Sequence, residues 1–95
     1  MRHIALYKWR DGTSAEQIES ALAKVKAMRD KIPEIVRLEC GPNLADDAAG
    51  YTHYVLVEVA DLAAFSAYKR HPAHEVVRQA ISPVLSDHLS LDTEP

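Results

Sequence analysis

The chain has 95 residues, of which 14 are acidic and 11 are basic, and its formal net charge is -3 at pH 7. This length predicts one domain over residues 1–95 with a single core, and the absence of any Lys or Arg run argues against nucleic-acid binding. No stretch approaches the roughly 18 apolar residues of a membrane span, and a single cysteine cannot form an internal disulfide. We therefore expect a soluble, cytoplasmic domain that binds neither nucleic acid nor membranes.

A strand and a helix are predicted at the beginning of the chain. Residues 3–9 alternate between two largely apolar faces, which is typical of a strand. One face of this strand carries His3, Ala5, Tyr7 and Trp9. Ser14 and Gln17 then have the spacing of a capping box and predict a helix from 14 to 31, which ends before Pro33. The predicted buried stripe of this helix consists of Ile18, Ala21, Leu22, Val25 and Met28.

Two further strands are predicted on either side of a loop. Residues 35–40 alternate, and the apolar face of this strand carries Val36, Leu38 and Cys40. The loop from 41 to 50 is rich in turn-forming residues. Residues 51–59 form the clearest strand of the chain. Its two faces carry His53, Val55, Val57 and Val59 on one side and Thr52, Tyr54, Leu56 and Glu58 on the other.

Two helices and a last strand are predicted in the remainder. Asp61 is a suitable N-cap for a helix that ends near Arg70. The residues of this helix predicted to point inward are Leu62, Ala64, Phe65 and Tyr68. Pro72 disfavours helical geometry at His71, so a separate helix begins at Pro72 and ends near residue 83 or 84. Its apolar stripe consists of His74, Val77, Ile81 and Leu85. Residues 87–93 alternate and predict a short strand with His88, Ser90 and Asp92 on one face and Leu89 and Leu91 on the other.

This order of elements predicts an α+β fold of the ferredoxin-like class. Its split βαβ pattern gives a four-stranded antiparallel sheet with the helices on one face. The other face would expose a large apolar surface, formed by Ile4, Leu6, Tyr54, Leu56, Leu89 and Leu91. Two such sheets packed face to face would bury this surface, so we expect a twofold homodimer whose joined sheets form an α+β barrel.

Several polar rings are predicted to converge between the sheet and the helices. The residues on this side are His3, Tyr7, His53, Tyr68, His74 and, if the last strand has the matching register, His88. A buried nitrogen without a hydrogen-bond partner costs on the order of 1–3 kcal/mol. These groups are therefore expected either to bond one another or to line a pocket.

Each ring also has a structural interpretation. His3 suits a strand edge, and His53 suits a hydrogen bond to a neighbouring strand. The hydroxyl of Tyr68 suits a partner at the core edge, and His74 suits a satisfied position in the core. His71 lies at the helix break, where we expect it to bond the local backbone or face water. Only the predicted convergence favours a functional interpretation.

No cofactor or metal is expected from the sequence. His71 and His74 lie three residues apart, but the helix break between them spoils helical ligand geometry, and no HExxH spacing is present. The three glycines form no phosphate-binding loop, and no Ser-His-Asp arrangement is evident. Cys40 is interpreted as a buried small apolar residue rather than a catalytic thiol.

Five motifs together resemble the stress-responsive α/β-barrel family. They are His3-Ile4, Lys31-Ile32-Pro33, Gly50-Tyr51-Thr52-His53, Tyr68-x-x-His71-Pro72-Ala73-His74 and the closing Leu91-Asp92. The resemblance spans nearly the whole chain and implies a dimeric ferredoxin-like barrel. One class of this family, the plant polyketide cyclases that make olivetolic acid, uses the pocket between sheet and helices for an intramolecular aldol condensation.

The resemblance to these cyclases implies roles for four residues. Tyr68 and His74 match the proposed acid/base pair, in which His74 is the general base and Tyr68 the hydrogen-bond donor. His3 and His53 match residues that line the pocket. This chain departs from the bulky apolar lining of the cyclases by offering Ala5, Tyr7, His88 and Ser90. The more polar lining predicts a smaller or more oxygenated carbonyl substrate.

Two functions are consistent with the sequence. The first is a cofactor-free lyase or cyclase that acts on a small carbonyl or polyketide-like compound. The alternative is a non-catalytic, stress-related dimer that binds a small ligand. An open cavity at the polar rings would favour the enzyme, whereas a filled core would favour the alternative. A cofactor-free monooxygenase shares the expected fold but lacks these motifs.

Overall fold

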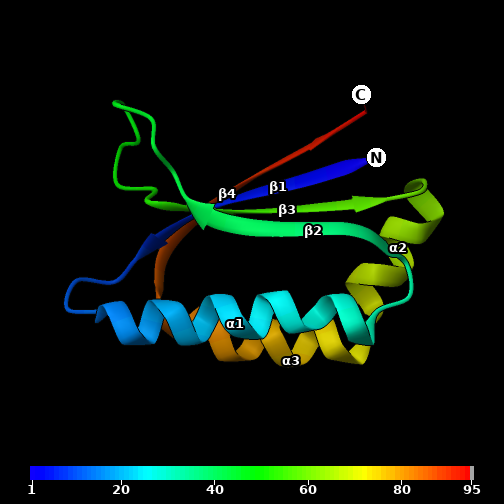
Figure 1. Cartoon of the computed structure of the whole chain (residues 1–95), viewed down its shortest axis with the longest axis horizontal. Helices are drawn as coiled ribbons and strands as arrows, with labels where there is room; N and C mark the ends of the chain where they lie inside the picture. The colour runs from blue at the N-terminus through cyan, green and yellow to red at the C-terminus, as the bar shows by residue number, and fades with distance from the viewer. Residues whose placement is uncertain (95) are drawn as a thin grey trace.

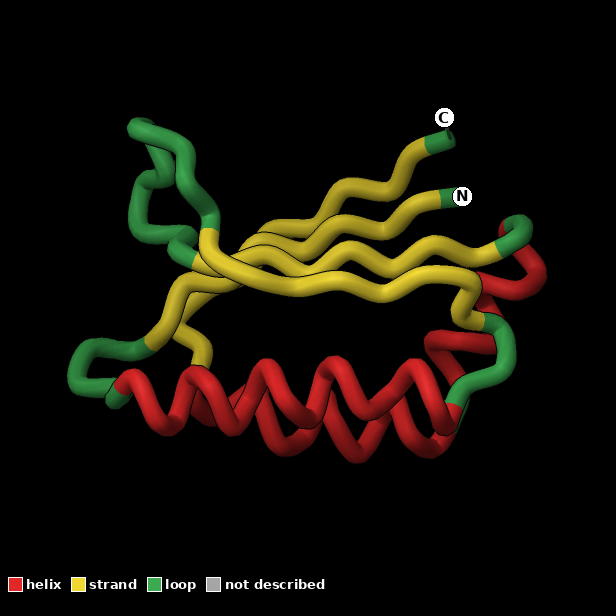
Figure 2. The backbone as a smooth tube through the Cα atoms, in the orientation of Figure 1, coloured by secondary structure: helices red, strands yellow, loops and turns green. Residues whose placement is uncertain are grey.

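The computed structural model describes residues 1–94, which form four strands, three α-helices and one 3-10 turn (Figure 1). In chain order the elements are β1 (Arg2–Trp9), α1 (Ala15–Lys31), β2 (Ile35–Pro42), β3 (His53–Val59), α2 (Leu62–Arg70), α3 (Pro72–Ile81), the 3-10 turn (Ser82–Val84) and β4 (Leu85–Thr93). The strands pair antiparallel in the order β2-β3-β1-β4. Figure 2 shows α1 and α3 side by side beneath one face of the sheet, which confirms the predicted ferredoxin-like α+β fold.

The predicted starts of the first two helices are confirmed by their capping groups. The hydroxyl of Ser14 accepts a hydrogen bond from the Gln17 amide at 3.1 Å, and the Gln17 side chain accepts one from the Ser14 amide at 2.8 Å. The Asp61 carboxylate accepts a hydrogen bond from the Ala64 amide at 2.8 Å. These side chains satisfy amides that the first turn of a helix leaves without a partner.

The prediction that Val36 points inward is wrong. The register between β2 and β3 shifts between Ile35 and Arg37, so Val36 is the extra residue of a bulge and is 56% exposed. Ile35 takes the inward position instead and is 8% exposed. A one-residue insertion of this kind reverses which face each neighbouring side chain occupies.

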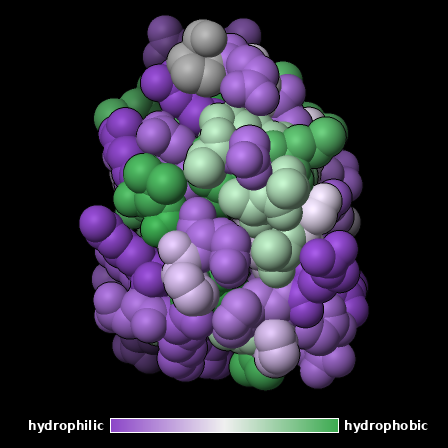
Figure 3. Space-filling view, turned by 90° about the vertical axis from the view of Figure 1, so that its right-hand side faces the viewer, coloured by the Kyte–Doolittle hydropathy of each residue, from purple (hydrophilic) through white to green (hydrophobic). Residues whose placement is uncertain are grey.

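The prediction that Leu62 points inward is also wrong. Leu62 is the first residue of α2 and is 67% exposed, whereas Phe65 and Tyr68 of the same helix are each 3% exposed. The helix covers the sheet only from its second turn onward. Figure 3 faces this end of the molecule and shows hydrophobic surface among hydrophilic side chains.

The core lies between the sheet and the helices. Its most completely buried large side chains are Val25, Ile32, Val57 and Val59. Most of the buried strand residues belong to β3, at the centre of the sheet, whereas the inward face of β1 contributes the small residue Ala5 to the core. Space therefore remains under the β1 and β4 side of the sheet. None of the helices in residues 1–94 is long and apolar enough to cross a membrane.

No helix in residues 1–94 covers the outer face of the sheet (Figure 2). Two apolar rows cross its strands, Leu91-Ile4-Leu56 and Leu89-Leu6-Tyr54. At the edge strand β4, Leu89 is 51% exposed and Leu91 is 58% exposed. The apolar outer face expected from the sequence is therefore present in the single chain.

Candidate active site

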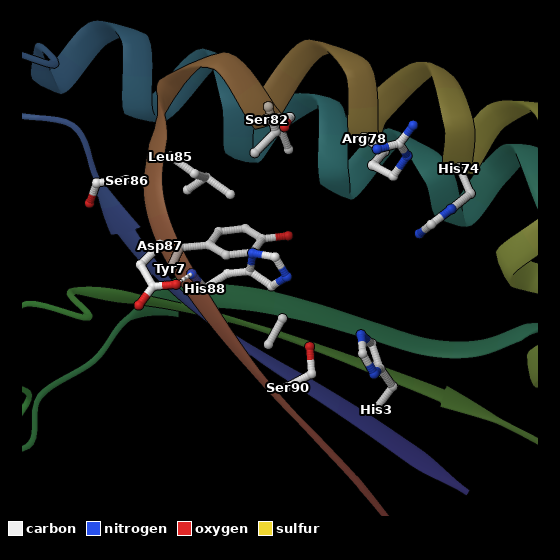
Figure 4. A pocket seen from close by; sticks show the side chains of 12 residues that line it. His3, Tyr7, His74, Arg78, Ser82, Leu85, Ser86, Asp87, His88 and Ser90 are labelled. Carbon is white, nitrogen blue, oxygen red and sulfur yellow. Dashed lines mark hydrogen bonds between the residues drawn. The ribbon is translucent and has the colours of Figure 1, made fainter.

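A pocket of about 500 Å³ lies between the inward faces of β1 and β4 and the helix α3 (Figure 4). Its floor follows directly from the strand register. Two cross-strand pairs line the pocket, Ala5 with Ser90 and Tyr7 with His88, and His3 lines it beside its own cross-strand partner Asp92, which lies outside the lining. The polar alternation of β4 therefore reflects a strand that lines a pocket rather than one that completes the core. The small side chain of Ala5 leaves the middle of the floor open.

His74 is placed on the pocket wall by the break between α2 and α3. The Nδ1 atom of His71 accepts a hydrogen bond from the Ala73 amide at 3.0 Å, so His71 caps α3 as expected for a junction residue. Pro72 then occupies the first turn of α3. His74 follows within the same turn and, as Figure 4 shows, its ring points into the pocket from above, with the His3 ring rising from the floor opposite.

His74 and Tyr68 are in direct contact. Their ring centroids are 4.8 Å apart in an edge-on arrangement, and Tyr68 also stacks on Phe65. The Nδ1 atom of His74 is buried and is the one buried side-chain polar atom in residues 1–94 without a well-aligned hydrogen-bond partner. The Lys69 carbonyl interacts with this ring, so the nitrogen is poorly bonded rather than wholly unsatisfied.

The surroundings of His74 and Tyr68 hold both groups in their neutral forms. Burial lowers the pKa of His74, and the nearby His3 acts in the same direction, while the Lys69 carbonyl opposes it. Burial and the neighbouring Tyr7 raise the pKa of Tyr68 well above its ordinary value. At neutral pH the site therefore offers an unprotonated imidazole, which can accept a proton, beside a phenol that keeps its proton.

We expect His74 to titrate below the ordinary histidine pKa of 6.5. Because the unfolded chain then binds more protons than the folded chain, the stability that His74 contributes is present above pH 6.5 and is lost as the pH falls through its folded pKa. Histidine NMR titration of the wild type measures the midpoint, with His74→Gln identifying the signal. A midpoint at or above 6.5 would contradict the burial of this ring.

His3 has a carboxylate partner on the adjacent strand. Its Nδ1 atom lies 2.5 Å from Oδ1 of Asp92, and its ring packs against Phe65 with 5.2 Å between centroids. A carboxylate on one imidazole nitrogen fixes the orientation of the ring and leaves Nε2 as the group available to a ligand. The pairing with Asp92 was not foreseen from the sequence, although the alternation of β4 placed Asp92 on the correct face.

The structure brings together some of the predicted residues and separates others. His3, Tyr7, His74 and His88 line the pocket, and Tyr68 supports its wall through His74. His53 does not line the pocket, because it pairs with Tyr7 on the β3 side of β1, away from β4. Its Nδ1 atom instead accepts a hydrogen bond from the Trp9 indole at 3.0 Å. The structural interpretation of His53, a bond to a neighbouring strand, therefore describes its position.

The structure also bears on metal binding, on the Cys40 thiol and on a further residue of the pocket wall. No group of three or more potential metal-ligating side chains is found in residues 1–94. Cys40 packs against the core, and burial raises the pKa of its thiol, the opposite of what a reactive thiolate needs. Arg78, which sequence reasoning missed, lies on the pocket wall. Its position four residues after His74 was the available signal.

The fold and the site define a small α+β domain whose ligand pocket lies between an antiparallel sheet and its covering helices. Residues 1–95 match the family described as the stress responsive A/B barrel domain, and the chain belongs to this family. No curated protein sequence matches the chain.

Three solved structures illustrate the similarity. A Thermobifida fusca protein, described as dimeric, ferredoxin-like and of unknown function, is 30% identical over 95% of this chain and 85% of its own, with a TM-score of 0.83. An Arabidopsis thaliana protein is 25% identical over 99% of this chain and 93% of its own, with a TM-score of 0.92. A hydroxynitrile lyase from Passiflora edulis is 22% identical over 99% of this chain and 95% of its own, with a TM-score of 0.87.

Proposed function

We propose that the protein is a cofactor-independent lyase or cyclase that acts on a small carbonyl or polyketide-like compound. The observation that carries this proposal is the His74 imidazole, which faces an open pocket, has no well-aligned partner at its buried Nδ1 atom and contacts the phenol of Tyr68. The motif resemblance to olivetolic acid cyclases supports it. The Passiflora edulis lyase has the same fold, so this fold is compatible with lyase chemistry.

In the proposed reaction His74 removes a proton from the carbon next to a carbonyl group. The electron pair of the broken C–H bond forms the enolate, and the Tyr68 hydroxyl, beside the His74 ring, donates a hydrogen bond to His74 or to the enolate oxygen. The enolate carbon then attacks a second carbonyl of the same molecule and forms a C–C bond. Protonated His74 returns its proton to the new alkoxide. All of these steps use groups of this chain and need no oxidant or reductant.

The remaining lining residues have binding roles in this proposal. The imidazole of His3, oriented by Asp92, and the side chains of Tyr7 and His88 offer hydrogen bonds to substrate oxygens. These groups lie along the floor, and His74 lies on the wall opposite (Figure 4). Such a lining suits an oxygenated compound better than a long alkyl chain.

The test is exchange of α-protons, because this first step does not require the natural substrate. Acetophenone in D₂O loses its methyl signal as deuterium replaces hydrogen, and proton NMR follows that loss. The protein is expected to accelerate the exchange over buffer at the same pH. No acceleration by the wild type would favour the alternative of a ligand-binding protein without catalysis.

We also propose that the protein is a homodimer joined through the outer face of the sheet. The Thermobifida fusca relative is described as dimeric, and the apolar rows through Ile4 and Leu6 need cover. Light scattering is expected to give twice the chain mass of 10.6 kDa at micromolar concentration. Leu91→Asp should yield monomers. Both chains of a twofold dimer carry the substitution, so each dimer would have to bury two carboxylates.

The matched control for this prediction is Val76→Asp. Val76 is 66% exposed on α3, in the helical layer, so a carboxylate there lies away from the outer face of the sheet. This variant should keep the mass of the wild type. A monomeric wild type, or the same mass for all three proteins, would refute a dimer through this face.

A further inference from the structure

We propose that Arg78 makes the pocket selective for carbonyl compounds that also carry a carboxylate. The inference rests on the proposed function in one respect, since His74 defines where the reacting carbonyl lies. It adds a substrate class, an oxo acid in which the carboxylate is held one helical turn away from the reacting carbon.

The position of Arg78 follows from the spacing of α3. His74 and Arg78 are four residues apart, and Ser82 follows four residues later, so all three lie along the same wall of the pocket (Figure 4). With a rise of 1.5 Å per residue, His74 and Arg78 are separated by about 6 Å along the helix axis. A para-disubstituted aromatic ring spans such a separation between its two substituents.

The guanidinium of Arg78 is already held in place. Its Nε atom donates to Oε2 of Glu75 at 2.9 Å, and its Nη2 atom donates to Oε1 at 2.6 Å. Gln79 donates a further hydrogen bond to Glu75 at 3.1 Å. Two of the five N–H groups of Arg78 are used in this way, and within residues 1–94 the others have no hydrogen-bond partner and could bind an anion. A fixed planar fork with free donors suits a carboxylate.

The charges around the pocket favour the Arg78 position for an anion. Among the lining residues in the described part of the chain, Arg78 is the one with a permanent positive charge, and Asp87 is the one carboxylate. Asp87 accepts hydrogen bonds from the Tyr51 hydroxyl at 2.6 Å and from the His88 amide at 2.9 Å, so it stays ionised at the Tyr7 end of the pocket. A ligand carboxylate is repelled there and attracted to Arg78.

The experiment compares two ligands that differ in one charge. The probes are 4-acetylbenzoate and its methyl ester, and isothermal titration measures the dissociation constant of each. The wild type should bind the acid about fivefold more tightly than the ester, as expected for a charged pair that remains partly exposed to water. Arg78→Met keeps the aliphatic stem and should remove this preference. Arg29→Met, which changes an exposed arginine of α1, should preserve it.

Glu75→Gln separates ligand binding from a purely structural role of the ion pair. This variant breaks the same ion pair as Arg78→Met but frees the guanidinium, so its affinity for the acid should rise about twofold. If Arg78 acted only through its pair with Glu75, both variants would shift affinity in the same direction. Equal affinity of the wild type for acid and ester, or no binding of either, would overturn this inference. The titration measures binding without turnover. A negative result in the α-proton exchange assay would therefore not alter the affinities measured for the acid and the ester.

Discussion

Replacing His74 with glutamine is expected to lower protein-catalysed α-proton exchange of acetophenone by roughly two to four orders of magnitude, the usual contribution of a general base. Glutamine has a similar reach and remains polar, but its amide cannot accept a proton near neutral pH. The rate for the wild type should rise with pH through the lowered pKa of His74, because only the neutral imidazole acts as the base. The His74→Gln variant should lose that pH dependence.

Tyr68→Phe should give a smaller loss, of about 100-fold, because it removes one hydrogen-bond donor to His74 or to the enolate oxygen and leaves the base in place. The ring of phenylalanine keeps the stacking on Phe65 and the edge-on contact with His74. Its pH profile should therefore still report the titration of His74. A Tyr68→Phe variant with the full wild-type rate would assign Tyr68 to packing alone.

His53→Gln tests whether a histidine outside the pocket lining contributes to the exchange reaction. The cyclase resemblance placed His53 beside the substrate, whereas the structure places it in a hydrogen bond with Trp9, outside the pocket lining. We therefore expect this variant to retain most of the exchange rate. A loss as large as that of His74→Gln would show that His53 does reach the substrate. Urea unfolding of each variant separates loss of chemistry from loss of fold.

The fold was predictable because its signals are local. The capping box at Ser14 and the N-cap at Asp61 fixed the starts of two helices, and the proline at position 72 separated the last two. Strand alternation then assigned faces correctly in β1 and β3. It failed at Val36, which is the extra residue of a bulge. The bulge is defined by the pairing of β2 with β3 and cannot be recognised from the alternation of β2 alone.

The site was only partly predictable, because it depends on register between strands distant in sequence. The sequence placed His3, Tyr7 and His88 on inward faces, but only the β1-β4 pairing brings Asp92 to His3. The β1-β3 register pairs His53 with Tyr7 on the side of β1 away from β4, so His53 lies apart from His3 and His88. Face assignment alone says which side a residue occupies and not how far along the strand it lies.

Ile32→Ala is expected to lower the free energy of unfolding by about 3 kcal/mol, within the range for truncation of a fully buried isoleucine. Ile32 is 1% exposed, and its amide donates to the Met28 carbonyl at 2.9 Å as α1 ends. The residue is absent from the predicted stripe of α1 because it follows the last helical residue. It lies four residues after Met28 and therefore extends the buried stripe of α1 into the C-cap position, one residue beyond the predicted end of the helix.

Urea unfolding at one fixed protein concentration is the appropriate measurement, because a dimer gains stability as concentration rises. Ile32→Val removes a single methylene and should cost about 1 kcal/mol, whereas Val36→Ala, on the exposed bulge, should change stability by less than about 0.5 kcal/mol. This order of effects follows from burial and not from hydrophobicity, since both wild-type residues are branched and apolar. If Val36→Ala cost as much as Ile32→Ala, Val36 would be covered in the assembled protein, and the edge at β2 would belong to an interface.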